Sequence, residues 1–157
     1  MAAFQLIIPE GNYENDDAVD RVIEYVCRLN KPKQIGGLGV YPLQPEYMIC
    51  QFKAVKNYYG KIAGKQIFHL IISFDKSLNF SIEEIVEMGY AIAAYWGAER
   101  QVVFAVHDDT LNKHIHIVIN SVAYTNGAYK AFYALDEIRD YIDSVVQAEI
   151  DRKWFGK

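Results

Sequence analysis

Histidines are concentrated in one short stretch of this chain. Three of the four, His107, His114 and His116, fall within ten residues. The segments that carry them, residues 100–107 and 114–122, are rich in β-branched residues and predict the strands of an antiparallel hairpin. Because side chains alternate across a strand, His114 and His116 share one face, and a suitable register brings His107 beside them. Three imidazoles on one hairpin predict a divalent-metal site with positions open for substrate or water, which is typical of a catalytic metal.

The neighbours of these histidines supply further candidates. Asp109, in the predicted hairpin turn, is placed to orient a ligand imidazole or to polarise its ring N–H, so we count it as a candidate catalytic residue. Asn120 follows His114 and His116 on the same strand face. His69 lies in another predicted strand, where it could be a fourth ligand, a phosphate contact or a packed core histidine, and the residues leave all three open. Histidines satisfied one by one by hydrogen bonds are the alternative to a metal site.

The elements that must position these residues follow from periodicity and end signals. Apolar, β-branched runs predict strands at residues 3–8, 66–74, 100–107 and 114–122. Helical spacing predicts helices at residues 15–29 and 135–154, a weaker one at 47–59, and one that opens with a Ser81–Glu84 capping box and stops near Gly97. Residues 31–45, rich in glycine and proline, predict a long loop or an edge strand.

This order of elements predicts an α+β fold. We expect a central antiparallel sheet with helices packed mainly on one face and the active site on the other. In the last strand Ile115, Ile117 and Ile119 alternate with the histidines and are expected to face the helices. With 157 residues and 52% apolar content, the chain is expected to form a single domain over residues 1–157.

Sequence features that mark a compartment are few. The chain has no run of 18 or more apolar residues, and its first residues lack the basic lead and cleavage site of a signal peptide, so we expect a cytoplasmic protein without a membrane segment. Cys27 and Cys50 have no metal or redox spacing and are expected to be reduced and structural.

The charge pattern is uneven along the chain. The formal net charge of −4 argues mildly against a nucleic-acid-binding protein, since phosphate contacts normally come from a basic surface. The stretch from Arg28 to Lys65, however, holds seven bases and one acid. This asymmetry permits a DNA-facing side, and a solvated basic face is the alternative. The candidate DNA-binding residues are His69, Lys31, Lys33, Lys53, Lys56 and Asn120.

At two places the residues carry a family resemblance. The stretch HDDTLNKHIHIVIN, His107–Asn120, resembles the H-x-D-T…H-x-H-x-x-x-N signature of conjugative relaxases, the mobilization nucleases of the HUH endonuclease superfamily. Upstream, GKQIFHLIISFD, Gly64–Asp75, is similar to that family's histidine and Ser-Phe strand. The resemblance covers about Val19–Tyr133 and implies a relaxase-like fold.

The resemblance also implies a reaction on single-stranded DNA at an origin of transfer, for plasmid or mobile-element mobilization. A divalent metal, Mg²⁺ or Mn²⁺ with other ions able to bind three histidines, polarises the scissile phosphate, and a tyrosine attacks to leave a covalent 5′-phosphotyrosine. The family's nucleophile lies on or just before the first helix, and RVIEYV, Arg21–Val26, places Tyr25 at the match. Tyr13, Tyr58 and Tyr59 are the other candidates. Accessory relaxosome or coupling proteins are implied as further partners.

Two other functions stay open at the level of the residues. A metallohydrolase acting on a small molecule could use the same three imidazoles and a metal-bound hydroxide without any tyrosine. A catalytically inactive DNA-binding remnant of a relaxase could keep the fold and lose the reaction. Loss of a covalent DNA adduct on replacing Tyr25 separates the relaxase from both.

Overall fold

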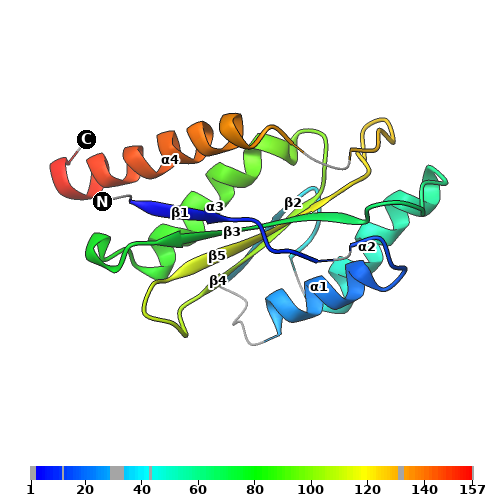
Figure 1. Ribbon diagram of the computed structural model, residues 1–157, viewed down its shortest axis with the longest axis horizontal. Helices are drawn as coiled ribbons and strands as arrows, with labels where there is room; N and C mark the ends of the chain where they lie inside the picture. Colours follow the sequence, from blue (N-terminus) through cyan, green and yellow to red (C-terminus); the bar gives the residue numbers. More distant parts are fainter. Residues whose placement is uncertain (1–2, 12, 29–33, 43, 131–132, 157) are drawn as a thin grey trace.

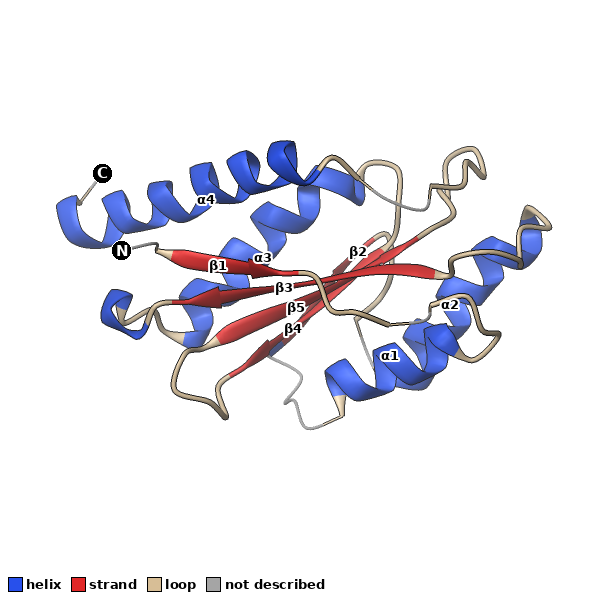
Figure 2. Ribbon diagram, in the orientation of Figure 1, coloured by secondary structure: helices blue, strands red, loops and turns tan. Residues whose placement is uncertain are grey.

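A five-stranded antiparallel sheet forms the centre of the molecule, in the order β1-β3-β5-β4-β2. The structure is a computed structural model that describes residues 3–11, 13–28, 34–42, 44–130 and 133–156. Its strands are β1 (Phe4–Ile7), β2 (Ile35–Leu38), β3 (Ile67–Phe74), β4 (Val102–His107) and β5 (His114–Asn120). Its helices are α1 (Ala18–Cys27), α2 (Pro45–Tyr58), α3 (Ile82–Gly97) and α4 (Leu135–Phe155), with a 3-10 turn at Lys76–Leu78. Figures 1 and 2 show this arrangement.

The elements expected from the sequence are present, with ends shifted by a few residues. The glycine-rich stretch contributes β2, which pairs with β4 at one edge of the sheet, so the edge-strand expectation is confirmed. The described helices include none that is long and apolar enough to span a membrane.

The β4–β5 hairpin has the register that the histidine cluster requires. His107 pairs with His114, and Ala105 pairs with His116. Residues paired directly across antiparallel strands point to the same face, so all three histidines lie on one face of the sheet.

The neighbouring strand β3 adds the fourth histidine to that face. His69 pairs with Val118 of β5, two residues along from His116. Because residues two apart on a strand share a face, His69 lies diagonal to His116. The face of the sheet that carries the histidines is called the histidine face below.

Helices α3 and α4 cover the opposite face. The fully buried residues there include Leu70, Ile72, Ile85, Ile92, Phe104, Ile115, Ile117 and Ile119. The predicted capping box begins α3, because Glu84 N donates to Ser81 Oγ at 3.1 Å and Ser81 N donates to Glu84 Oε1 at 2.9 Å. The isoleucines of β5 therefore face these helices, as expected from alternation.

Helices α1 and α2 pack on the histidine face, which corrects the expected placement of the helices. This second core contains Val19, Val22, Ile23, Val26, Met48, Phe52, Val103, Ala105 and Val118. The physical reason is that the side chains next to the histidines on this face are apolar and must be buried. The α+β class and the antiparallel sheet are confirmed, but the helices are divided between both faces (Figure 1).

Candidate metal centre and active site

The structure brings the three predicted metal ligands together. One ring nitrogen from each of His107, His114 and His116 lies within 4.8 Å of those of the other two. The ring centroids are 5.1 Å apart for His107 and His114, 4.4 Å for His107 and His116, and 5.3 Å for His114 and His116. His116 is buried and the other two are half-buried, so the cluster is reached from outside along His107 and His114.

Carbonyl oxygens fix the position of the proton on two of these rings. Nε2 of His107 lies 2.7 Å from the carbonyl oxygen of Val26, and because a carbonyl only accepts, Nε2 carries the hydrogen. Nδ1 of His114 lies 3.3 Å from the carbonyl of Asn112 and 3.2 Å from the hydroxyl of Thr110, which itself donates to Asn112. The hydrogen of His114 is therefore on Nδ1. Nδ1 of His107 and Nε2 of His114 keep a lone pair for a metal ion.

His69 lies against His116 and is bonded on both sides. Its Nε2 is 2.9 Å from Nδ1 of His116, and the two rings stack with centroids 5.2 Å apart. Its Nδ1 is 3.3 Å from the hydroxyl oxygen of Tyr13. With both nitrogens engaged and a side chain only 5% exposed, His69 is neither a fourth ligand nor a contact for DNA in this structure. The DNA-binding role predicted for His69 is wrong, because the residue is buried and both of its ring nitrogens are hydrogen-bonded within the protein.

Burial keeps the two inner histidines uncharged. It lowers the pKa of His116 to about 3, with His107, His69 and His114 adding to the effect. It also lowers the pKa of His69 to about 4, with His107 adding. Both imidazoles are therefore neutral at physiological pH, and protons do not compete with a metal ion for the lone pair of His116.

The donor set fits a divalent metal ion. An imidazole ligand must be neutral, and it normally hydrogen-bonds through the nitrogen that does not touch the metal. Each ring of the cluster meets this condition, with Val26, the Thr110–Asn112 turn and His69 as the partners. One nitrogen per ring remains, which is the number that a three-histidine catalytic site uses.

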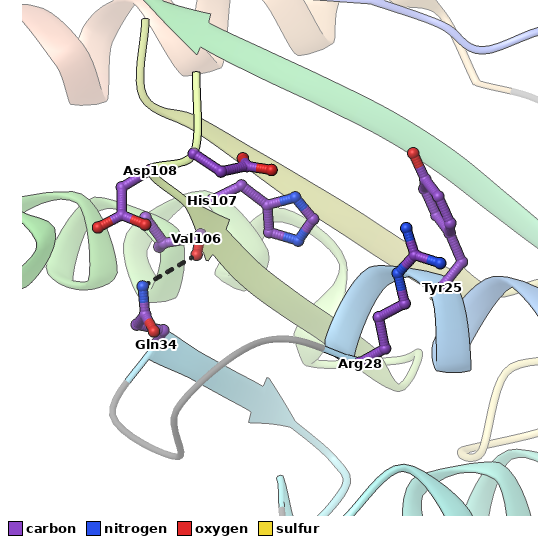
Figure 3. A pocket seen from close by; sticks show the side chains of 7 residues that line it. Tyr25, Arg28, Gln34, Val106, His107 and Asp108 are labelled. Atoms are coloured by element: carbon purple, nitrogen blue, oxygen red, sulfur yellow. Dashed lines mark hydrogen bonds between the residues drawn. The ribbon is translucent and has the colours of Figure 1, made fainter. Parts of the chain in front are cut away.

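Tyr25 projects from α1 beside this cluster. Its ring meets that of His116 edge-on, with centroids 6.0 Å apart and planes at 82°, and its side chain is 52% exposed. The guanidinium carbon of Arg28, one helical turn further on, lies 5.1 Å from the centre of the Tyr25 ring. A cavity of about 120 Å³ adjoins these side chains (Figure 3). It is lined by Tyr25, Arg28, Gln34, Val106, His107, Asp108 and Asp109.

The two aspartates of the hairpin line the same cavity. Among the described residues no hydrogen bond joins Asp109 to a histidine of the cluster, and the imidazoles are oriented by the partners named above. The orienting role predicted for Asp109 is thus carried by other groups, and Asp109 lines the cavity together with Tyr25 and His107. Asp108 and Asp109 together oppose the single positive charge of Arg28. A bound divalent ion would reverse this balance and make the cavity attractive to a phosphate.

The other candidate nucleophiles are less well placed. Tyr13 is buried, and its hydroxyl faces His69. Tyr58 and Tyr59 lie at the end of α2, where the hydroxyl of Tyr59 donates to the carbonyl of Tyr124. Within the described part of the chain, Tyr25 is the tyrosine whose ring contacts a ring of the metal cluster.

Among the described residues, the bases of this stretch do not gather on one DNA-facing surface. Lys31 and Lys33 lie outside the described residues. Lys53 of α2 is half-exposed and forms an ion pair with Asp20 of α1 at 2.5 Å. Lys61 donates to the carbonyl of Gly127. For Lys53, Lys56 and Lys61, charge counting along the sequence therefore overestimated the free positive charge.

Lys56 and Asn120, both predicted to bind DNA, are buried at 3% and 0% exposure, so that prediction is wrong. The Lys56 ammonium donates to Gln66 O at 2.6 Å, Asn120 Oδ1 at 2.7 Å and Ser121 Oγ at 3.0 Å. The Asn120 amide donates to Phe52 O and to a neighbouring glutamine side chain. This network ties α2 to the ends of β3 and β5, because the polar groups there cannot reach water and must be paired.

Replacing Lys56 with methionine is expected to destabilise the fold without changing the arrangement of the three histidines. The substitution removes one donor from each of three buried oxygens, of which the Gln66 carbonyl and Asn120 Oδ1 keep another donor, so we expect the free energy of unfolding to fall by about 1–3 kcal/mol. Urea denaturation at pH 7 measures it. Lys53→Met in the same helix removes a half-exposed ion pair and should cost less than about 1 kcal/mol. Equal losses in the two variants would contradict the structural role of Lys56.

The same lysine should make stability depend on pH. Burial, with the charge of Arg100 adding, lowers the pKa of Lys56 from 10.5 to about 7. Between these pH values the unfolded chain binds the proton that the folded chain releases, so stability rises as the pH rises from 7 toward 10. The methionine variant should lack this part of the pH dependence.

Two features of the site were not found from the sequence. Arg28 was counted only within the basic stretch, although its position three residues after Tyr25 on a helix puts both on one side of α1. Tyr13 was considered only as a nucleophile, and nothing in the sequence signals its contact with His69, which lies 56 residues away.

Comparisons with known proteins place this geometry in a family. Residues 25–149 match the model of the relaxase family described as "MobA/VirD2-like, nuclease domain". The protein rlx of Staphylococcus aureus is 33% identical over 104 residues, which cover 64% of this chain and 31% of rlx. The protein TraI of Escherichia coli is 38% identical over 147 residues, which cover 85% of this chain and 20% of TraI. The chain thus spans less than a third of the length of these two curated relatives.

The fold also has a solved counterpart. A structure reported as "Molecular Basis of Vancomycin Resistance Transfer in Staphylococcus aureus" superposes with a TM-score of 0.65. The match covers 96% of this chain and 93% of the other, at 10% sequence identity. At that identity the likeness concerns the fold alone, and it confirms the predicted fold class.

Proposed function

Since this chain belongs to the relaxase family, as a MobA/VirD2-like nuclease domain, we propose that it nicks single-stranded DNA at an origin of transfer through Tyr25. The observation that carries the proposal is the edge-on contact of Tyr25 with His116, beside three imidazoles that each keep one nitrogen for a metal ion. The reaction of a small-molecule hydrolase does not require an exposed tyrosine at this position. In an inactive remnant, nothing would maintain Tyr25 together with the three histidines.

The proposed reaction is a transfer of the phosphate from one oxygen to another. The phenolic oxygen of Tyr25 forms a bond to phosphorus, the bond between phosphorus and the 3′ oxygen breaks, and the 5′ phosphate stays on the tyrosine. The phenol proton leaves to a base, and the 3′ oxygen takes up a proton as it departs. The energy of the phosphodiester is retained in the phosphotyrosine, so the DNA can be rejoined later.

Each residue of the cavity has a proposed part in this step. The three histidines hold a divalent ion, Mg²⁺ or Mn²⁺, which when bound would polarise a phosphate oxygen as a Lewis acid. Asp109 is the proposed acceptor of the phenol proton, because Asp109 and Tyr25 line the same cavity. Arg28 is proposed to neutralise the negative charge that builds up on the phosphate. Single-stranded DNA is the proposed substrate, and accessory relaxosome or coupling proteins are proposed partners.

A selection from random DNA tests this function without knowledge of the target. The protein is incubated with Mn²⁺ and a single-stranded library, and covalent adducts are recovered on a denaturing gel and sequenced. We expect an enriched sequence with one cleavage position, and a peptide containing Tyr25 attached to its 5′ phosphate. If no adduct forms with the library or with oligonucleotides from known origins of transfer, the relaxase proposal is wrong.

Replacing Arg28 with glutamine is expected to slow adduct formation by about 10–100-fold, since one charge-assisted contact to the transition state is lost. Lysine at this position should recover part of the rate. Single-turnover measurements with saturating DNA give the rate directly. Arg139→Gln, on α4 at the opposite face, is the control and should have no effect. A wild-type rate for Arg28→Gln would remove Arg28 from the mechanism.

A further inference from the structure

Three buried side chains form a hydrogen-bonded row that leads from the interior of the protein to the histidine cluster. Tyr13, His69 and His116 are 8%, 5% and 3% exposed. The row runs from the Tyr13 hydroxyl to Nδ1 of His69 at 3.3 Å, and from Nε2 of His69 to Nδ1 of His116 at 2.9 Å. Only the last of these residues belongs to the proposed ligand set.

The direction of the hydrogen bonds in this row follows from the need of His116 to offer one nitrogen lone pair to a metal ion. A metal ion requires the lone pair of one ring nitrogen, and Nδ1 of His116 already faces His69. If Nε2 of His116 carries the lone pair, its hydrogen is on Nδ1 and is donated to Nε2 of His69. The hydrogen of neutral His69 is then on Nδ1 and is donated to the oxygen of Tyr13. Each of the two rings then donates one hydrogen along the row, and the oxygen of Tyr13 accepts the last of them.

We propose that His69 and Tyr13 are positioning residues that hold His116 in the tautomer whose Nε2 binds the metal. This inference rests on the proposed metal-dependent function and adds two residues that do not touch the metal or the DNA. Tyr13 is itself anchored, because the backbone N–H of Gln66, the residue before β3, donates to its carbonyl at 2.7 Å. The row therefore connects the N-terminal segment to the metal site through β3.

The choice of histidine as the partner of His116 has an electrostatic consequence. A carboxylate in this place would donate negative charge to the ligand and reduce the positive charge of the ion. A neutral imidazole fixes the ring equally well in direction but leaves the charge of the ion intact. With Asp108 and Asp109 already in the cavity, a neutral partner preserves the attraction for an incoming phosphate.

The experiment uses the whole chain and Mn²⁺ alone, without DNA. Mn²⁺ affinity is measured by calorimetry for the wild type and for His69→Leu, His69→Gln and Tyr13→Phe. Leucine removes the acceptor for His116, so we expect an affinity loss of about 10–100-fold. The amide oxygen of glutamine can accept the same hydrogen, so this variant should stay within about fivefold of the wild type. Tyr13→Phe should lose about 3–10-fold, because its effect passes through His69.

A second readout decides the tautomer itself. Long-range ¹H–¹⁵N spectra of the metal-free protein should show the hydrogen of His116 on Nδ1 in the wild type and in His69→Gln, and a change in His69→Leu. Tyr133→Phe is the matched control, because the buried hydroxyl of Tyr133 has no hydrogen-bond partner among the described residues. It should leave both the affinity and the spectrum unchanged.

The outcomes separate this inference from the proposed function. A folded His69→Leu variant with wild-type Mn²⁺ affinity, or a wild-type His116 protonated on Nε2, overturns the positioning role. If the wild type does not bind Mn²⁺, the metal-dependent function fails, and the spectrum of the metal-free protein still decides whether His69 sets the tautomer.

Discussion

Tyr25→Phe is expected to abolish the covalent protein–DNA adduct, with a loss of about 10³-fold or more in the rate of cleavage. The phenylalanine ring can keep the edge-on contact with His116 and the contact with Arg28, so the change removes the nucleophilic oxygen and little else. The measurement is adduct formation on a denaturing gel, with the oligonucleotide selected from the library. DNA affinity and Mn²⁺ affinity should stay near those of the wild type.

The other tyrosines of the chain provide the matched controls for this test. Tyr58→Phe alters a side chain that is 82% exposed at the end of α2, and it should cleave DNA as the wild type does. Tyr13→Phe should reduce cleavage only as far as it weakens the metal. If Tyr25→Phe still forms an adduct, another hydroxyl attacks the phosphate, and the adducted peptide identifies it. Cleavage without an adduct would favour a metal-bound hydroxide as the nucleophile, as in the hydrolase alternative.

The cluster of three histidines could be predicted because it depends on local rules. Alternation along β5 puts His114 and His116 on one face, and a short hairpin limits the register that brings His107 to them. The capping box at Ser81 is equally local, since its two partners are three residues apart. In such cases the chain between the interacting residues is short enough for its geometry to be known from the sequence.

The residues that were misjudged depend on contacts between distant parts of the chain. Lys56 was assigned to DNA from its charge, but its acceptors come from the ends of β3 and β5, and a sequence gives no sign that a lysine will be buried. The placement of α1 and α2 was misjudged for a related reason. Val103 and Val118 lie on the histidine face, and burying these apolar side chains requires helices on that face as well.

The position of α1 also explains how Tyr25 comes to lie beside the histidines of the β4–β5 hairpin. Its apolar stripe packs on the sheet, so the end of the helix approaches the histidines, and the carbonyl of Val26 receives the hydrogen of His107. Tyr25, the residue before Val26, is thereby fixed beside His116. The contact that orients His107, a proposed metal ligand, and the contact that places the proposed nucleophile are thus made by neighbouring residues of one helix.

Removing one proposed metal ligand is expected to reduce cleavage as much as removing the proposed nucleophile. His114→Ala should reduce cleavage by about 10³-fold or more and should not be rescued by added Mn²⁺, whereas wild-type protein treated with a chelator should recover on Mn²⁺ addition. His114 is half-buried, so its loss should change the stability of the metal-free fold little. Lys113→Ala, the preceding residue, is the control and should cleave normally.

Metal removal should weaken DNA binding as well as cleavage. An ion that only activates the phosphate for cleavage would leave DNA binding unchanged. The cavity without metal contains two carboxylates and one guanidinium, so it repels the phosphate that must enter. Filter binding to the selected oligonucleotide, with and without chelator, measures the effect. If His114→Ala binds DNA as tightly as the metal-loaded wild type, the ion does not attract the phosphate. The electrostatic reason given for a neutral His69 beside His116 would then fail. Weakened binding that Mn²⁺ restores only in the wild type supports an ion that both attracts the phosphate and activates it.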